Sequence, residues 1–193
     1  MRNSIERALN VLMHDGLVVY PTDTLYGLGG DALSDEAILK VFEAKGREYY
    51  KPISIAVSDP DMIGAVAYVD EMAEEFIDEF LPGPVTVILP ARKIISARLT
   101  AGTKKIGIRY PDHEIALELI SRFDSPITAT SANLSGGPDP VSIELCNVPY
   151  DCAINAGPLP GICSTVVDLE FREIIRAGVD IESIAAFLSR WSC

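Results

Sequence analysis

Residues 17–30 read LVVYPTDTLYGLGG. The apolar run that opens this stretch stops at Pro21, which predicts a short buried strand. Thr22 and Thr24 follow it, and hydroxyls at a strand end offer both a donor and an acceptor, as a small amino-acid or phosphate ligand needs. The glycines match neither a P-loop nor a dinucleotide-binding fingerprint. A plain turn stabilised by Asp23 and the glycines is therefore the alternative to a binding loop.

Helix-like and strand-like segments alternate on both sides of this stretch, which predicts a sheet covered by helices. We expect helices over 4–14, 35–44, 61–68, 71–80, 113–122 and 181–190. We expect strands over 17–20, 53–57, 85–89, 106–109, 127–130, 165–169 and 173–176. Ser34 and Asp112 are expected to cap the helices that follow them.

The last two expected strands follow one another directly and should pair, so the order is not a regular βαβ alternation. The predicted fold class is therefore α/β, with one twisted, mixed β-sheet of about seven strands flanked by helices. A chain of 193 residues is within the usual range for one domain, and we expect a single domain over residues 1–193.

The charge balance is acidic, with 28 acidic against 16 basic residues and a net charge of −12. This argues against a surface that coats nucleic acid, which would be basic, but it leaves a local basic cleft open.

The four cysteines, Cys146, Cys152, Cys163 and Cys193, form no C-x-x-C pair, and the chain has only two histidines. We therefore expect no metal site, and buried or terminal thiols in a reducing cytosol. No apolar run approaches the roughly 18 residues that span a bilayer. The mature chain is expected to start near Met1 and to stay in the cytoplasm, away from membranes.

A basic cluster, KGREYYKP, covers residues 45–52 between an expected helix and an expected strand. Lys45, Arg47 and Lys51 indicate a phosphate clamp, because lysine supplies a point charge and arginine a planar fork for two oxygens. The alternative is that these cations only complement the C-terminal end of the helix dipole.

A third polar cluster, TATSANLSGG at 128–137, follows another strand end and brings in Ser131 and Asn133. Loops at strand ends are where α/β sheets place ligands, although a capped turn explains the same residues. Arg109 and Arg176 close the apolar strands IGIR and EIIR, where arginine either binds a ligand or extends to the surface. Ser131 has no Asp/His partner nearby in the sequence, so a catalytic triad has little support.

Together these segments resemble the YrdC family, whose enzyme members are threonylcarbamoyl-adenylate synthases. The markers run in the family's order from about residue 4 to 178: PTDTLYGLG, AKGR with KPIS, LPGPVTVIL, GIRYP, TSANLSG, STVVD and IIRAG. The resemblance is to the short, single-domain branch. It implies a YrdC/RibB-like α/β fold, in which helices and a twisted mixed sheet surround a concave basic cleft.

The resemblance also implies an activity. L-Threonine, bicarbonate or CO2, and ATP with Mg2+ on its phosphates become threonylcarbamoyl-AMP and pyrophosphate. A separate tRNA threonylcarbamoyl transferase complex then uses the product to modify an adenosine next to the anticodon. Two alternatives are a YciO-like paralogue that acts on another carbamate or nucleotide, and a module that binds double-stranded RNA.

Residue roles follow from the matching motifs. The resemblance assigns Lys45, Arg47, Ser131 and Asn133 to catalysis and, with Lys51 and Arg176, to ATP binding. It assigns the threonine side to Thr22, Thr24, Ser54, Arg109 and Ser164. It implies no metal ligand from the protein itself.

Overall fold

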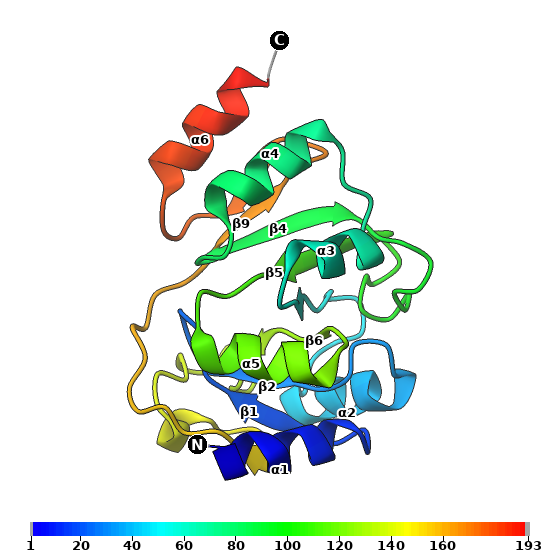
Figure 1. The fold of residues 1–193 in the computed structure, drawn as a ribbon, viewed down its shortest axis with the longest axis vertical. Helices are drawn as coiled ribbons and strands as arrows, with labels where there is room; N and C mark the ends of the chain where they lie inside the picture. Colours follow the sequence, from blue (N-terminus) through cyan, green and yellow to red (C-terminus); the bar gives the residue numbers. More distant parts are fainter. Residues whose placement is uncertain (1, 192–193) are drawn as a thin grey trace.

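The computed structural model describes residues 2–191, whose helices and strands build two β-sheets with helices packed around them (Figure 1). The helices are α1 (Arg2–Leu12), α2 (Asp35–Lys45), α3 (Pro60–Val66), α4 (Glu71–Phe80), α5 (Glu114–Phe123), α6 (Ile181–Arg190) and the 3-10 helix η1 (Ile143–Leu145). The strands are β1 (Val18–Tyr20), β2 (Gly27–Gly29), β3 (Ile55–Ala56), β4 (Val85–Pro90), β5 (Lys105–Arg109), β6 (Ile127–Thr128), β7 (Thr130–Ser131), β8 (Cys152–Ala153), β9 (Thr165–Asp168) and β10 (Glu173–Arg176).

The strands divide into a four-stranded sheet, β7-β2-β1-β8, and a six-stranded sheet, β10-β9-β4-β5-β3-β6. Each sheet holds parallel and antiparallel pairs, for example β1 with β8 and with β2, and β4 with β9 and with β5. The expected mixed α/β class is therefore confirmed, and so is the pairing of β9 with β10.

The expectation of one sheet with about seven strands is wrong, because ten strands within residues 2–191 form two sheets. The expected strand over 127–130 divides at Ala129, so that β6 pairs with β3 in one sheet and β7 pairs with β2 in the other. The additional strands β2 and β8 are only two or three residues long, and β2 is Gly-Leu-Gly. Such segments have too little apolar alternation to be recognised in a sequence.

All six expected α-helices are present, and one of the two expected caps is formed. Ser34 accepts a hydrogen bond from the backbone of Ala37 at 3.3 Å, so it caps α2 as predicted. Asp112 does not cap α5, contrary to expectation. His113 is the N-cap residue and makes no side-chain cap hydrogen bond, while its backbone N–H donates to the Pro111 carbonyl at 2.9 Å.

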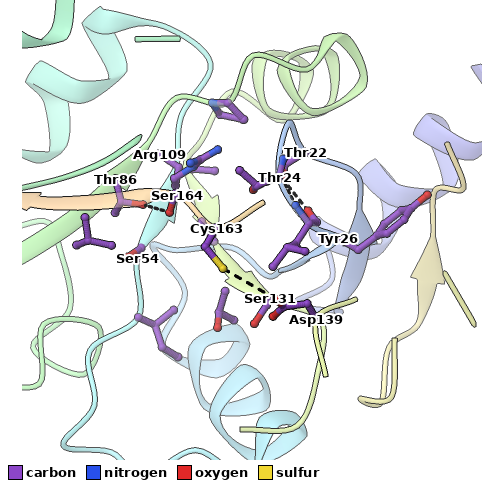
Figure 2. A pocket seen from close by; sticks show the side chains of 18 of the residues that line it. Thr22, Thr24, Tyr26, Ser54, Thr86, Arg109, Ser131, Asp139, Cys163 and Ser164 are labelled. Carbon is purple, nitrogen blue, oxygen red and sulfur yellow. Dashed lines mark hydrogen bonds between the residues drawn. The ribbon is translucent and has the colours of Figure 1, made fainter. Parts of the chain in front are cut away.

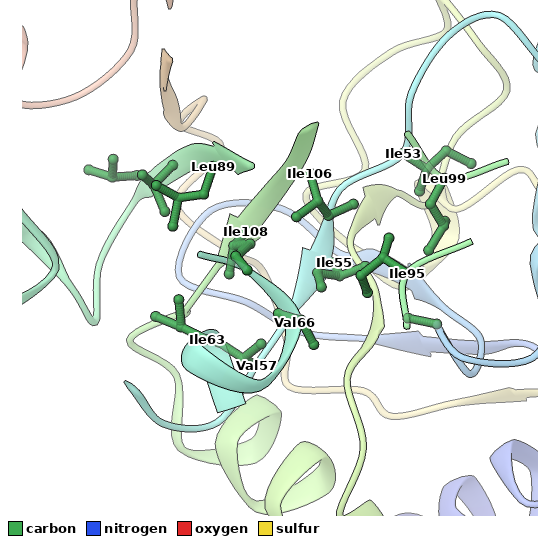
Figure 3. Close-up of a cluster of buried hydrophobic side chains, with 14 of the residues drawn as sticks. Ile53, Ile55, Val57, Ile63, Val66, Leu89, Ile95, Leu99, Ile106 and Ile108 are labelled. Carbon is green, nitrogen blue, oxygen red and sulfur yellow. The ribbon is translucent and has the colours of Figure 1, made fainter. Parts of the chain in front are cut away.

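Two apolar clusters hold the layers together. In the larger one, helices α3, α4 and α6 pack with the six-stranded sheet, and Phe76 meets Phe187 edge to face at 5.2 Å. Figure 3 shows part of this cluster, where Ile63 and Val66 of α3 pack with Ile55 and Ile108 of the sheet. In the smaller one, apolar residues of α1 and α5 pack with β1.

None of the helices in residues 2–191 is long and apolar enough to cross a membrane.

Candidate active site

A cavity of about 260 Å3 lies where the two sheets meet, with walls that belong to both (Figure 2). It brings together most of the residues singled out in the sequence, namely Thr22, Thr24, Arg47, Ser54, Arg109, Ser131, Ser164 and Arg176. Three predicted site residues, Lys45, Lys51 and Asn133, do not line it.

The turn between β1 and β2 is shaped by the hydroxyl of Thr22. It donates to the Leu25 carbonyl at 2.7 Å and accepts from the backbone N–H groups of Thr24 and Leu25 at 3.1 and 3.2 Å. Because the single hydroxyl hydrogen of Thr22 is directed at Leu25, the 2.9 Å contact between the two threonine hydroxyls has Thr24 as donor. Both threonines line the cavity, but the hydroxyl of Thr22 is already hydrogen-bonded to the backbone of the turn.

Lys45, the last residue of α2, is only 2% exposed and points into the loop that follows β7. Its ammonium group donates to the carbonyls of Ser131 and Asn133, and at 3.4 Å to the Asn133 side chain. Burial, followed by the nearby charge of Arg47, lowers its pKa to about 8. In this geometry Lys45 holds the 131–133 loop in place behind the cavity wall.

Asn133 completes that loop. Its side-chain amide donates to the carbonyls of Gly137 and Pro138 at 2.9 and 3.0 Å, while its oxygen accepts from the Ser131 hydroxyl at 2.6 Å. The Ser-x-Asn pair predicted from the sequence therefore forms one unit, in which Ser131 faces the cavity and Asn133 supports it.

The side chains of Arg47 and Lys51 point in different directions although the two residues are close in the sequence. Arg47 lines the cavity and donates to the carbonyls of Lys51 and Pro52 at 3.2 and 2.8 Å, so its guanidinium is fixed before any ligand arrives. Partial burial lowers the pKa of Arg47. Lys51 points outward and pairs with Glu48 at 2.6 Å, with half of its side chain exposed.

Arg109 ends β5 in the middle of the six-stranded sheet, beside Thr86 of β4 and Ala56 of β3. It is 6% exposed and forms an ion pair with Asp23 of the β1–β2 turn. Burial lowers the pKa of Arg109, and the charge of Asp23 opposes that shift. Burial also raises the pKa of Tyr20, which lines the cavity nearby.

Arg176, the last residue of β10, binds the segment that precedes β9. Its guanidinium donates twice to the Ser164 carbonyl, at 3.1 and 3.0 Å, and once to the Ser164 hydroxyl at 2.8 Å. Ser164 in turn lies 2.9 Å from the Thr86 hydroxyl, so β4, β9 and β10 share one polar network at the cavity wall.

Several lining residues were not predicted as site residues, among them Thr86, Asp139 and Cys163. Asp139 lies two residues beyond the 128–137 cluster, and its carboxylate is 3.9 Å from the Cys163 sulfur (Figure 2). Cys163 is exposed, contrary to the expectation of buried thiols, whereas Cys152 is buried and Cys146 half-buried. Cys193 lies outside the described residues.

The cavity as a whole is cationic, because Arg47, Arg109 and Arg176 line it and Asp139 is the acidic residue in its wall. Fixed guanidinium groups next to hydroxyls suit phosphate and carboxylate oxygens. In residues 2–191 no three His, Cys, Asp or Glu side chains are grouped so as to hold a metal ion. Fold and site together define a mixed α/β protein with a cationic cavity between two sheets, whose side chains suit a small anionic ligand.

The family model Sua5_yciO_yrdC, described as telomere recombination, matches residues 10–178, so the chain belongs to the Sua5/YciO/YrdC family. This confirms the resemblance inferred from the order of the motifs.

Relatives come from three domains of life and are named threonylcarbamoyl-AMP synthase. The Pyrococcus abyssi protein is 37% identical over 86% of this chain, the Bacillus subtilis protein 38% over 84%, and the Mus musculus protein 32% over 97%. This chain spans 50%, 49% and 71% of the length of those three proteins, respectively.

Solved structures agree with the fold. P. abyssi Sua5 in complex with L-threonine superposes with a TM-score of 0.89 at 35% identity, over 95% of this chain and 56% of that one. E. coli YciO superposes with a TM-score of 0.82 at 26% identity, over 93% of this chain and 91% of that one.

Proposed function

We propose that this protein is an L-threonylcarbamoyladenylate synthase, which converts L-threonine, bicarbonate or CO2, and ATP into threonylcarbamoyl-AMP and pyrophosphate. The observation that carries the proposal is that Arg47, Arg109 and Arg176 converge with Ser131 on one cavity, in a member of this family. A threonine carboxylate and a triphosphate are both anionic, and this cavity offers separate cations from both sides.

The chemistry requires two anions to react. An oxygen of threonine carbamate forms a bond to the α-phosphorus of ATP, and the bond from that phosphorus to the bridging oxygen breaks to release pyrophosphate. The barrier comes largely from charge repulsion and from alignment. Arg47 is already held by two backbone carbonyls, so it lowers the repulsion without having to reorganise. Mg2+ would enter with the phosphates of ATP, since the described residues offer no cluster of metal ligands.

ATP and threonine are proposed to contact different parts of the cavity wall. ATP would lie toward Arg47, Arg176 and Ser131, with Lys51 outside the entrance. Threonine would lie toward Arg109, with Thr22, Thr24, Ser54 and Ser164 around it. The contacts of Lys45 and Asn133 support a role in shaping the Ser131 loop, so we assign their effect on catalysis to that loop.

The test is an assay with ATP, Mg2+, bicarbonate and labelled L-threonine, in which labelled threonylcarbamoyl-AMP and pyrophosphate are measured. We expect product from the wild type only when threonine and bicarbonate are both present. Arg47→Ala and Ser131→Ala should each lower the rate by about 100-fold, as loss of one oxyanion donor does in other enzymes. Lys93→Ala, an exposed cation outside the cavity, is the control and should stay active. ATP turnover that ignores threonine would refute the proposal.

A YciO-like activity on another carbamate or nucleotide is the second candidate. It is favoured by one observation, the match to E. coli YciO over 91% of that chain. Under this alternative the protein would bind ATP, with Arg47→Ala weakening that binding, but would form no threonylcarbamoyl-AMP. A screen with other carbamates would then find the acceptor.

We further propose a single domain over 1–193 that works in the cytoplasm and passes its labile adenylate to a tRNA threonylcarbamoyl transferase complex. Binding of double-stranded RNA is less compatible with a net charge of −12. If RNA did bind, its affinity should fall steeply with salt.

A further inference from the structure

Three buried side-chain atoms of the described residues lack a hydrogen-bond partner, and they belong to neighbouring residues. They are Oδ2 of Asp23, Nη1 of Arg109 and Nδ1 of His113. Arg109 is ion-paired with Asp23. Burial lowers the pKa of His113, and the charge of the same Asp23 carboxylate opposes that shift. Unpaired buried polar atoms are rare in folded proteins, and their concentration in one place calls for a functional explanation.

The ion pair connects the two sheets. Asp23 lies in the turn between β1 and β2 of the four-stranded sheet, whereas Arg109 ends β5 of the six-stranded sheet. The hydrogen bonds of Thr22 fix that turn and thereby fix the residue that follows it. Asp23 therefore reaches Arg109 across the boundary at which the cavity lies.

Arg109 depends on this carboxylate. It is 6% exposed, and burial lowers its pKa, as does the charge of Arg176. The described carboxylate in contact with it is Asp23, which binds its Nη2 and leaves Nη1 unpaired. Arg109 lines the cavity whereas Asp23 is not among its lining residues, so we expect the carboxylate to hold the guanidinium without occupying the ligand's place.

We propose that Asp23 is a positioning residue that orients Arg109 to receive the carboxylate of the amino-acid substrate. This rests on the proposed function, in which Arg109 belongs to the threonine side of the cavity. The ion pair of Asp23 is with Arg109 and not with Arg47, so its loss should affect threonine and leave the binding of ATP at Arg47 nearly unchanged.

The experiment uses the full chain and Asp23→Asn, which keeps the size of the side chain and removes its charge. L-Threonine binding is measured by calorimetry, and KM for threonine, KM for ATP and kcat are measured separately. We expect KM for threonine to rise about 10-fold or more, the scale of a hydrogen bond to a charged group. KM for ATP should change by less than about 2-fold. Asp23→Glu, which keeps the charge, should recover part of the threonine affinity.

Asp168→Asn is the matched control, because the Asp168 side chain is 8% exposed, against 10% for Asp23, and is likewise paired with a cation, Lys105, at 2.9 Å, but lies outside the cavity wall. Thermal unfolding of both variants separates lost stability from lost positioning. If the control loses comparable stability while its KM for threonine is unchanged, a general effect of breaking a buried ion pair is excluded.

Two outcomes would overturn the inference. Tighter threonine binding by Asp23→Asn would mean that Asp23 competes with the substrate for Arg109. Equal increases in the KM of both substrates would mean that Asp23 only supports the fold. Failure of the proposed function is distinguishable, because then the wild type itself would form no threonine-dependent product.

Discussion

Several polar side chains around the cavity contact a segment that is distant in the sequence. Lys45 binds the carbonyl of Ser131, and Asp23 binds Arg109, in each case 86 positions away in the sequence. Residue type and position at a strand end pointed to side chains that do line the cavity, such as Arg109, Ser131 and Arg176. The partners could not be predicted, because a pairing over such a separation depends on how the two sheets come together.

Lys45 provides a prediction at this scale. Its folded-state pKa, about 8, lies below the ordinary 10.5, so between these values the folded protein binds fewer protons than the unfolded chain. Lys45 should therefore increase the free energy of unfolding as pH rises from 8 to 10.5. Lys45→Met removes this titration and leaves the carbonyls of Ser131 and Asn133 without their donor, at a cost of about 1–3 kcal/mol at pH 7.

Urea denaturation at several pH values between 7 and 10.5 measures this contribution. The stability gap between wild type and Lys45→Met should widen with pH, and Lys45→Arg, which keeps its charge throughout, should show no such trend relative to Lys45→Met. A gap that stays constant with pH would contradict the lowered pKa.

At the scale of elements, long helices could be predicted from the periodicity of their apolar residues, whereas very short strands could not. The helices α2, α4 and α6 begin where their periodicity predicted, because about ten residues of apolar spacing define each of them. Strands of two residues, such as β6 and β7, exist only through pairing with distant partners, so the sequence predicted them as one strand.

Two glycines should respond to alanine in opposite directions. A Cβ on Gly178 would lie 2.3 Å from the Cys163 carbonyl oxygen and 2.7 Å from the backbone of Ser164 and Thr165, whereas a Cβ on Gly64 in α3 would meet nothing within 4 Å. Gly178→Ala should therefore destabilise the protein by about 1–3 kcal/mol, and Gly64→Ala should stabilise it by about 0.5–1 kcal/mol. Thermal unfolding measures both.

The same pair of variants also bears on the site. Gly178 packs on the segment that carries Cys163 and Ser164 into the cavity wall, so Gly178→Ala should also reduce activity. Activity that is unchanged at a temperature where the variant remains folded would show that this segment tolerates displacement.

The start of α4 provides a prediction that should affect stability alone. Asp70 caps α4 by accepting from the backbone of Ala73 at 2.9 Å. Asp70→Ala should cost about 1 kcal/mol, and Glu71→Ala, an exposed residue one position later, should cost less. Because Asp70 is not in the cavity wall, ligand affinity should be the same in both variants. Chemical denaturation and calorimetric titration would test this, and a loss of affinity in Asp70→Ala would contradict it.

At the scale of the whole molecule, the charge of the cavity wall is opposite in sign to the net charge of the chain. The chain carries a net charge of −12, yet three of its arginines line one cavity. An acidic exterior keeps the protein soluble, and a local cationic site still attracts small anions because fields in a cleft are focused by its walls. The sequence indicated both features, but only the two-sheet arrangement explains how arginines from three separate segments meet.

The last prediction follows from the position of the cavity between the sheets. A ligand there contacts both sheets and binds the folded state only, so it should raise the melting temperature by linkage. At 100 times its Kd, ATP with Mg2+ would add about 2.7 kcal/mol, which for a chain of this size corresponds to roughly 5–10 °C. Threonine and bicarbonate should add to this shift. Differential scanning fluorimetry measures it, with Arg47→Ala expected to lose the ATP part. If ATP raised the melting temperature of wild type and Arg47→Ala equally, the nucleotide would bind elsewhere, and the assignment of this cavity would fail.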